Sequence, residues 1–469
     1  MAHSSNTDNP HTAAIASFVS GFRYERIPAD VLARIKLLVL DSLGCAIYGA
    51  DLAWSRILRE TLAELDETKS ACVWGTPDRL SPPHAVLVNG SLVQSFELDD
   101  VHRVGVLHVG AVTLPPIFAA IERDPSISGR DFLAATVAGY EIGPRVGICM
   151  GQEHIGQGWH SGATLGVFSA ACGAAAALRL DTEQTINAIG IAGTQSAGLM
   201  AAQYGAMVKR MHAGRSAQSG YYAAILARRG YTGIRNVFES EYGGFCSTFS
   251  RSHDRYDLRA LSAGLGERFE TLQIALKFYS CVGSNHTTLD AIRAIKLRRP
   301  FVVEEVERIV VYGSKVTVDH VGWPYRPEGL TSAQLNLPYC VATFLIEGDA
   351  FVAQFTEEKV TDPARIGFSR RVEVVEDPQI TALGPRYRHK VRVEIRLQNG
   401  EIHEETVEAP RGSEKKFATD QDVIDKFCKL AGSRMKDLQI DRIIDLVMNA
   451  ERLASARELA MALGERGQS

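Results

Sequence analysis

The amino-terminal half of the chain shows helical periodicity. From about residue 10 to about residue 265, apolar residues recur at every third or fourth position, and short polar breaks separate the segments. The stretch from Pro28 to Gly49 is an example, because Leu32 and Ile35 fall on one face of a helix. Proline is tolerated in a first helical turn and glycine at a helix end. The pattern therefore predicts a mainly helical unit with few strands.

The pattern changes after about residue 300, where β-branched residues become frequent. Residues 391–397 alternate strictly between apolar and charged side chains, and Asn399-Gly400 is a strong signal for a two-residue hairpin turn. This alternation predicts an antiparallel sheet with one face in water. Residues 331–348 return to helical spacing, so the second unit is expected to mix helices with strands.

Chain length predicts more than one domain. With 469 residues, the chain exceeds the roughly 250 to 300 residues at which a single core stops growing. The patterns place a large helical domain at 1–265, completed by an amphipathic helical tail at 411–469. A smaller inserted α+β lid domain is expected at 266–410. The expected fold class is therefore mainly α, with a small antiparallel sheet.

Composition narrows the range of partners. Apolar residues make up 45% of the chain and charged residues 23%, which is typical of a folded globular protein. A net charge of -4 offers no basic field for nucleic acid or anionic lipid. The first residues lack a basic region followed by an apolar core, so we expect a cytoplasmic protein. The eight cysteines form no C-x-x-C pair and are expected to be reduced thiols.

The uncharged run at 161–178 has the length of a membrane span. It consists mostly of alanine, glycine and serine, and basic residues are absent from its amino-terminal side. We therefore expect a buried helix whose backbone lies close to its neighbours, and no membrane partner.

Four separate segments combine titratable side chains with glycine and apolar neighbours. They lie at 97–108, 156–163, 204–217 and 277–292. Together they supply five candidates for chemistry: His108, His160, Lys209, His212 and His286.

Taken singly, each candidate also has a purely structural explanation. His160 and His286 would suit the ends of helices, and Lys209 would suit a solvated helix end. At least one of Asp99 and Asp100 is expected in a solvated loop or at the end of a helix. The repetition of the pattern in four segments is what favours a reaction site.

Familiar cofactor and metal motifs are absent from the sequence. It contains no G-x-G-x-x-G after a strand, no G-x-x-x-x-G-K-[ST] and no G-x-S-x-G. The histidines do not have the i, i+4 spacing of H-E-x-x-H, and the sequence indicates no metal site. The missing motifs argue against nicotinamide, nucleotide and serine-hydrolase chemistry, and the sequence gives no positive signal for a metal.

The candidates suit proton transfer on an anionic substrate. Histidines titrate near neutral pH and can exchange protons there. Removing a proton from a carbon next to a carboxylate places additional negative charge on the carboxyl oxygens. Lysine and arginine can both bind such carboxylates and stabilise the intermediate.

With these segments, the chain resembles the MmgE/PrpD family over nearly its whole length. The resemblance rests on ordered blocks that include NGSLVQSFELDDVH, GWHSGATLGVF, YGAMVKRMHAG, LKFYSCVGSNHTTLDAI and SAQLNLPYCVATFLIEG. It implies a helical domain, an inserted α+β domain, an active site in the cleft between them, catalysis without a cofactor, and a homodimer. On the family's pattern, the active-site positions are His108, His160, Lys209 and His286, with Tyr339 in the pocket.

Two features distinguish this chain within the resemblance. Its acidic run begins at Glu97, and Val101 follows the aspartate pair. This sequence is similar to that of a branch of the family that contains fungal decarboxylases and a bacterial epimerase. Arg215 adds a cation that the fungal decarboxylase pattern lacks.

These features favour an epimerase that acts by proton transfer at the carbon α to a carboxylate of a small dicarboxylate such as iminodisuccinate. In this hypothesis Lys209 and either His108 or His160 exchange protons with the substrate. The expected substrate-binding residues are Glu97, His212, Arg215, His286 and Tyr339. The alternative is a lyase of the same family, either a cis-aconitate decarboxylase or a 2-methylcitrate dehydratase. A third hypothesis, from another class, is a dimeric carboxylate-binding protein without catalysis.

Overall fold

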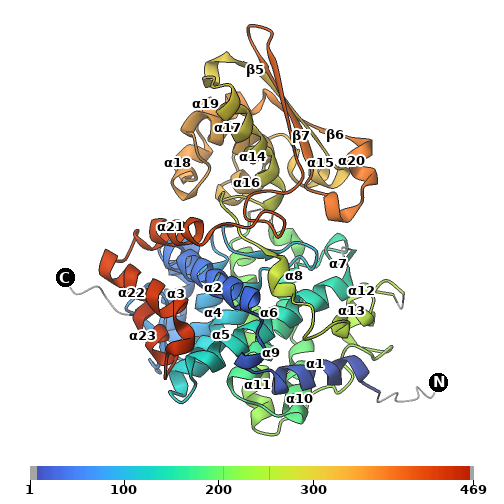
Figure 1. Ribbon diagram of the computed structural model, residues 1–469, viewed down its shortest axis with the longest axis vertical. Coiled ribbons are helices and arrows are strands. Elements are labelled where there is room, and N and C mark those ends of the chain that lie inside the picture. The colour runs from blue at the N-terminus through green and yellow to red at the C-terminus, as the bar shows by residue number, and fades with distance from the viewer. Residues whose placement is uncertain (1–7, 152, 204, 253, 465–469) are drawn as a thin grey trace.

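The computed structural model describes residues 8–464 except 152, 204 and 253. A large helical body lies beneath a smaller domain of mixed helices and strands (Figure 1). The mainly α fold class, with an α+β second domain, is thereby confirmed.

The helical body is built from long helices that pack side by side. Its longer helices are α1 (Pro10–Gly21), α2 (Ala29–Gly49), α3 (Ala53–Leu65), α4 (Pro82–Val93), α5 (Val109–Arg123), α6 (Gly129–Met150), α9 (Gly166–Ala177), α10 (Thr182–Gly193) and α11 (Val208–Arg228). Short helices complete it: α7 (Glu153–Gly156), α8 (Ser161–Thr164), α12 (Phe245–Ser250) and α13 (Arg259–Ser262).

Two small strand pairs also belong to the body. They pair β1 (Ala71–Cys72) with β2 (Arg79–Leu80), and β3 (Val101–His102) with β4 (Ile274–Ala275). The β3–β4 pair joins the segment of the first candidate loop to the strand that leads into the second domain.

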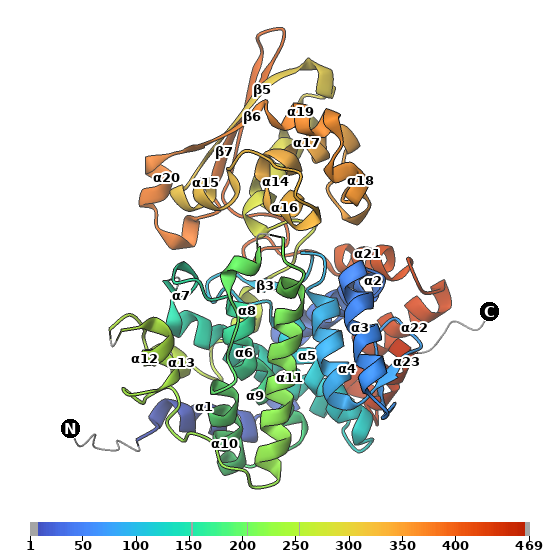
Figure 2. The same ribbon diagram turned by 180° about the vertical axis from the view of Figure 1, so that it is seen from behind.

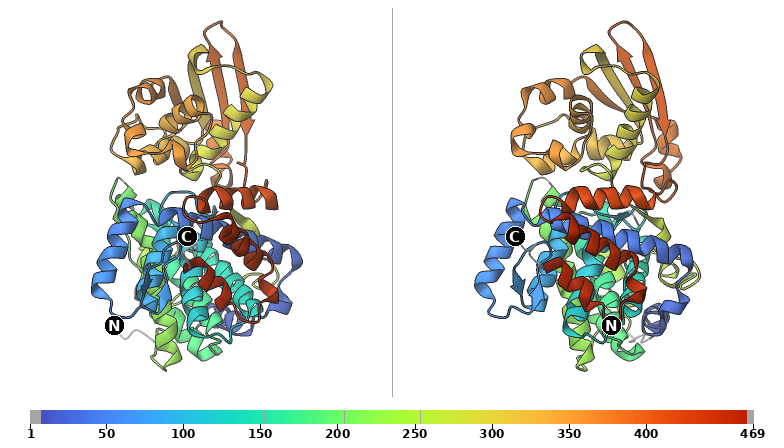
Figure 3. Two further views of the ribbon diagram at one scale, coloured as in Figure 1. Left: turned by 90° about the vertical axis from the view of Figure 1, so that its left-hand side faces the viewer. Right: turned by 60° about the vertical axis from the view of Figure 1, so that its left-hand side comes forward.

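The carboxy-terminal tail returns to the helical body. It forms α21 (Asp420–Ala431), α22 (Asp437–Met448) and α23 (Arg457–Gly464). Helix α21 packs on α2, and Figure 3 shows the red tail helices against the blue amino-terminal ones. The Lys426 ammonium on α21 donates to Asp41 of α2 at 2.5 Å and to the Leu98 carbonyl at 2.8 Å.

The second domain contains a four-stranded sheet in the order β6-β5-β7-β8. Its strands are β5 (Val306–Gly313), β6 (Val372–Glu376), β7 (Val391–Leu397) and β8 (Ile402–Val407). Its helices are α14 (Gly283–Arg298), α15 (Lys315–Val321), α16 (Leu330–Leu335), α17 (Leu337–Glu347), α18 (Glu357–Val360), α19 (Pro363–Ser369) and α20 (Pro378–Ala382).

Strand β7 shows why its sequence alternates. Val393 pairs with Val311 of β5, and both side chains are buried, whereas Arg396 on the other face is exposed. The hairpin from β7 to β8 turns through Gly400, whose φ of 89° suits glycine. Strand β6 is parallel to β5, so the sheet is mixed and departs from the purely antiparallel expectation.

The uncharged run at 161–178 forms the buried helices α8 and α9, as expected. The residues α9 presents to its neighbours are small, and a Cβ on Gly220 of α11 would lie 2.4 Å from the Ala170 Cβ. Gly214 of α11 approaches α4 as closely, because a Cβ there would lie 2.0 Å from the Leu87 carbonyl oxygen. These contacts fix the position of α11 in the body.

No helix within the described residues combines the length and apolar character that a membrane crossing requires.

Candidate active site

The acidic loop between α4 and α5 is buried against the second domain. Glu97, Asp99 and Asp100 are each at most 2% exposed, so neither aspartate lies in a solvated loop, one of the two structural explanations considered for them. The carboxylate of Asp100 accepts the Gly110 amide at 3.0 Å, at the start of α5. Burial nevertheless raises the pKa of Asp100 to about 8.

Three cations surround the carboxylate of Glu97. The Lys209 ammonium and the Arg210 guanidinium, at 2.8 Å, both contact Oε1, and the Lys277 ammonium lies 3.3 Å from Oε2. Burial alone would raise the pKa of Glu97, but Lys209, Lys277 and Arg210 outweigh it and hold the pKa well below its usual range. The backbone of Glu97 is left-handed, with φ 56°, which points to a conformation held by its surroundings.

Lys209 lies at the start of α11 and is buried, so the solvated helix end that it suggested in isolation is wrong. Burial lowers its pKa, with help from Arg210, and these effects outweigh the attraction of Glu97. Because three buried cations face one carboxylate, the cluster carries an excess of positive charge that suits an anionic substrate.

His160 and His212 form a pair beside this cluster. Their Nδ1 atoms lie 3.1 Å apart, so one imidazole donates a proton and the other accepts it. Burial lowers the pKa of His160 well below its usual range, and Lys209 and His212 lower it further. The pKa of His212 is lowered by burial and by Lys209. Burial and these charges therefore favour the neutral form of His160, contrary to the expectation that these histidines titrate near neutral pH.

His108 precedes α5 and lies against Asp99. Its Nδ1 is 3.1 Å from Asp99 Oδ2, which is an ion-pair distance, but neither atom has a hydrogen-bond partner among the described residues. The charge of His108 acts on both Glu97 and His160, so His108, His160 and Lys209 belong to one centre.

His286 comes from the second domain, in the first turn of α14. Its Nε2 lies 3.2 Å from the Cys281 carbonyl and must donate to it, so Nδ1 of a neutral imidazole is an acceptor. The ring stands edge-on to Tyr279, with centroids 5.2 Å apart.

Two sequence-derived candidates make their contacts elsewhere. The Tyr339 hydroxyl donates to the Lys359 carbonyl at 2.9 Å, and its ring stacks on Tyr325 inside the second domain. Arg215 is exposed on α11 and donates to Gln218. Among the residues that the structure describes, no hydrogen bond or ion pair joins either side chain to Lys209, and their binding roles stay predictions.

Sequence reasoning missed Lys277 and Arg210 as members of the centre. Lys277 opens the segment 277–292, and Arg210 follows Lys209, so both were present in the segments of interest. Only the fold shows that both side chains reach Glu97. His102 has a different role, because its Nδ1 accepts the Gly105 amide and its Nε2 lies 3.2 Å from Glu270.

Among the residues that the structure describes, no group of three or more His, Cys, Asp or Glu side chains is arranged to hold a metal ion. The described cysteines are all free, and none forms a disulfide.

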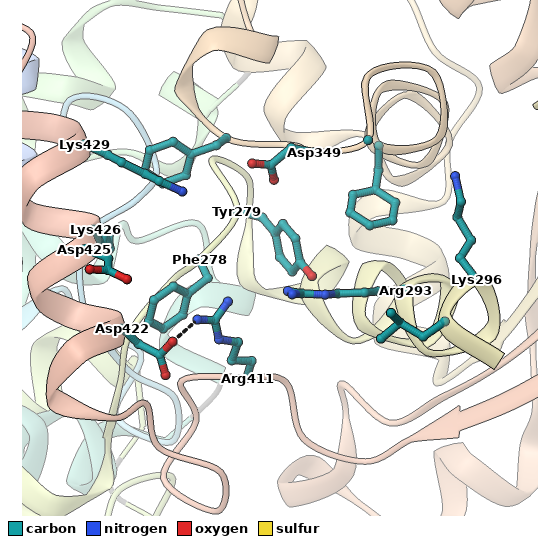
Figure 4. Close-up of a pocket in the computed structure, with 14 residues that line it drawn as sticks. Phe278, Tyr279, Arg293, Lys296, Asp349, Arg411, Asp422, Asp425, Lys426 and Lys429 are labelled. Carbon is teal, nitrogen blue, oxygen red and sulfur yellow. Dashed lines mark hydrogen bonds and ion pairs between the residues drawn. The ribbon is translucent and has the colours of Figure 1, made fainter. Parts of the chain in front are cut away.

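A cavity of about 410 Å³ lies where helices of the second domain meet α21 (Figure 4). Phe278 and Tyr279 line it, together with residues of α14, α17 and α21. Arg411 is paired there with Asp422, as the dashed line in Figure 4 shows. None of the predicted site residues lines this cavity. We therefore locate the chemistry at the cluster of Lys209 and the histidines, where the unbalanced charge and the paired imidazoles lie.

Comparison with known proteins covers nearly the whole chain. Residues 13–256 match the MmgE/PrpD N-terminal domain, and residues 279–451 match the MmgE/PrpD C-terminal domain. A cis-aconitate decarboxylase-like protein of Aspergillus oryzae is 34% identical, over 97% of this chain and 97% of its own length. Cis-aconitate decarboxylase of Aspergillus terreus is 33% identical, over 97% and 96%. The human cis-aconitate decarboxylase is 25% identical, over 96% and 94%.

These relatives favour the lyase alternative over the epimerase hypothesis. The resemblances that suggested an epimerase were the acidic run at Glu97 and the additional cation Arg215. Relatives named as decarboxylases match 97% of the chain, and the Arg215 guanidinium donates to Gln218.

Proposed function

The chain belongs to the MmgE/PrpD family, and we propose that it is a decarboxylase of cis-aconitate or a closely similar unsaturated tricarboxylate. The observation that carries this proposal is the buried cluster in which Lys209, Arg210 and Lys277 share the single carboxylate of Glu97. The names of relatives that match almost the entire chain supply the substrate class.

The charge of the cluster suits this reaction. A tricarboxylate trianion and one proton give carbon dioxide and an unsaturated dicarboxylate dianion. The carbon–carbon bond to the departing carboxylate breaks, and its electron pair returns to the carbon skeleton, where a proton is added. The enzyme must bind the remaining carboxylates, leave the departing one poorly solvated and supply the proton.

Lys209 is the proposed proton donor. Its pKa is lowered, which brings an ammonium closer to the range in which it releases a proton at neutral pH. His108, oriented by Asp99, is the proposed partner that exchanges the proton with solvent or substrate. Burial favours the neutral forms of His160 and His212, and this pair can donate a hydrogen bond to the substrate.

The test is turnover of cis-aconitate followed by proton NMR and by carbon dioxide release. We expect loss of the vinyl signal of cis-aconitate with the appearance of a five-carbon unsaturated dicarboxylate in equal amount to carbon dioxide. Lys209→Gln should reduce the rate by about 10²-fold or more, because positioned acid–base groups contribute roughly 10²- to 10⁴-fold. The matched control, Lys69→Gln, changes an exposed lysine of the body and should keep the parent rate.

The same sample separates the other reactions. In deuterated water, incorporation of deuterium into iminodisuccinate without release of carbon dioxide would establish epimerisation instead. Loss of water from 2-methylcitrate would establish dehydration. Binding of cis-aconitate without any turnover would support the non-catalytic carboxylate-binding protein.

A further inference from the structure

The amino-terminal end of α14 carries no cap. This helix has 16 residues, its N-cap position is Val282, and no side chain caps it. Its first turn contains no acidic residue. A Cβ on Gly283 would meet nothing nearer than Cε1 of His389, at 3.9 Å. The positive end of a long helix, with space above it, attracts an anion.

His389 presents a buried donor next to this helix end. The Arg388 Nε–H group can only donate, and it lies 3.2 Å from His389 Nε2, so Nε2 must be the acceptor. The proton of the neutral imidazole is therefore on Nδ1. The His389 side chain is buried, and its Nδ1 has no hydrogen-bond partner among the described residues. A buried N–H group without a partner is costly unless a ligand accepts its hydrogen bond.

The charges around His389 are predominantly positive. Within the described part of the chain, no carboxylate forms an ion pair with Arg388, whose Nη2 donates to the Arg103 carbonyl at 3.2 Å. Arg103 itself is paired with Glu414 at 3.3 Å. His320 lies close by, with Nδ1 3.4 Å from Ser284 Oγ.

Burial and neighbouring positive charges lower the pKa values of Arg388 and His389. Burial lowers the pKa of Arg388 to about 10, and Arg103 lowers it further. The pKa of His389 is lowered well below its usual range by burial and by the charges of Arg388 and Arg103. Both shifts are in the direction that a bound carboxylate would reverse.

This second cluster lies beside the proposed active site. His286 shares the first turn of α14 with Ser284. Arg103 belongs to the segment between Glu97 and His108. Helix α15, which carries His320, lies on the side of the second domain that faces the body (Figure 2). An extended substrate bound at Lys209 could therefore reach the end of α14.

We propose that the amino-terminal end of α14, Arg388 and His389 form a subsite for a substrate carboxylate remote from Lys209, and that this subsite selects tricarboxylates over dicarboxylates. The inference rests on the proposed function and identifies the residues that determine the substrate specificity of the same site. The body supplies the reacting groups, and the second domain holds the distal carboxylate.

Binding of two unreactive probes tests the subsite separately from turnover. Propane-1,2,3-tricarboxylate and maleate are titrated calorimetrically into the full-length parent, Arg388→Gln and the matched control Arg386→Gln, which changes an exposed arginine two residues away. We expect Arg388→Gln to weaken the tricarboxylate about 10- to 100-fold, as for loss of one charged hydrogen bond. Maleate affinity should change less than about twofold, since it needs no third anion site. Arg388→Lys, which keeps the charge, should recover part of the tricarboxylate affinity.

Equal tricarboxylate affinity in Arg388→Gln and the parent would overturn the subsite. So would an equal loss for both probes, because that pattern marks a general disturbance of the fold. If Arg388→Gln does not fold, the selectivity of Arg388→Lys decides in the same way: a loss confined to the tricarboxylate supports the subsite, and unchanged or equal affinities overturn it.

The proposed function fails by a different result. Selective loss of the tricarboxylate in a protein that releases no carbon dioxide from cis-aconitate would retain the subsite and reject the decarboxylase. Carbon dioxide release with the same KM in the parent and Arg388→Gln would retain the decarboxylase and reject the subsite.

Discussion

The Lys277 ammonium lies 3.3 Å from Oε2 of Glu97, and both side chains are buried. Lys277 stands in the segment that leads into the second domain, whereas Glu97 follows α4 of the helical body. The ion pair therefore links the entry to the second domain with the carboxylate that also holds Lys209.

Replacing Lys277 should impair catalysis through Glu97. Lys277→Met removes one of the three cations. The carboxylate of Glu97 then neutralises a larger share of the remaining positive charge, and the site attracts an anionic substrate less strongly. We expect kcat/KM for cis-aconitate to fall about 10- to 100-fold, the equivalent of one charged hydrogen bond. Steady-state kinetics measure this, with Lys69→Met as the control at an exposed position. An unchanged kcat/KM would show that Lys277 only supports the fold.

Removing the Glu97 charge should destabilise the protein in a pH-dependent way. Glu97→Gln leaves three buried cations without their carboxylate, and we expect a loss of about 3–5 kcal/mol of unfolding free energy at pH 7. The folded pKa of Glu97 is depressed, so its contribution is complete above the unfolded value near 4.5 and is lost as pH falls below it.

Urea unfolding of the parent and Glu97→Gln should therefore converge as pH is lowered from 4.5 through the folded pKa. Glu60→Gln, at an exposed position, is the matched control and should follow the parent. A stability difference that is constant from pH 7 through acid would contradict the assignment of the depressed pKa to Glu97.

Asp99→Asn should lower kcat more than it changes KM. The carboxylate lies 3.1 Å from His108 Nδ1, at ion-pair distance, and we expect it to hold the ring with Nδ1 toward Asp99 during the reaction. An amide can present either group to the ring, so the working orientation is lost, and we expect a fall in kcat of roughly 10²-fold or more. The comparison is Asp441→Asn, an exposed aspartate on α22. A rise in KM at constant kcat would instead indicate that Asp99 contributes to substrate binding.

Gly214→Ala should displace α11 and with it Lys209. The new Cβ would lie 2.0 Å from the Leu87 carbonyl oxygen, which is backbone and cannot rotate away. We expect a loss of about 1–3 kcal/mol in stability, as for overpacked cores, together with reduced activity. Gly367→Ala in α19 has no atom within 4 Å of the new Cβ and should be neutral or slightly stabilising. Thermal unfolding of both variants measures the difference, and equal melting temperatures would refute the close approach.

Dimerisation is a proposal carried from the family. We expect analytical ultracentrifugation of the full-length protein to give a species with twice the mass of the chain at micromolar concentration. A single species with the mass of one chain would reject it.

Local sequence was sufficient for most of the elements. Helical spacing around Leu32 and Ile35, and the alternation in β7, reflect how often a side chain returns to the buried face, which depends on the backbone alone. The same holds for the small residues of the run at 161–178, because close packing of a helix requires them wherever its partners lie. The family resemblance then added the histidines and Lys209 as members of one site.

Tertiary structure decided the electrostatics. Burial and charges far apart in sequence decide three features of the site: the solvation of Asp99, the pKa of His160 and the contact of Lys277 with Glu97. No local sequence pattern encodes this burial or these charges. Likewise, the unpartnered Nδ1–H of His389 exists only because Arg388 fixes its tautomer beside the end of α14. Periodicity in the sequence indicates which side of a helix or strand is buried. The pKa of a side chain depends on its burial and on all the charges and hydrogen-bonding groups that the folded chain places near it.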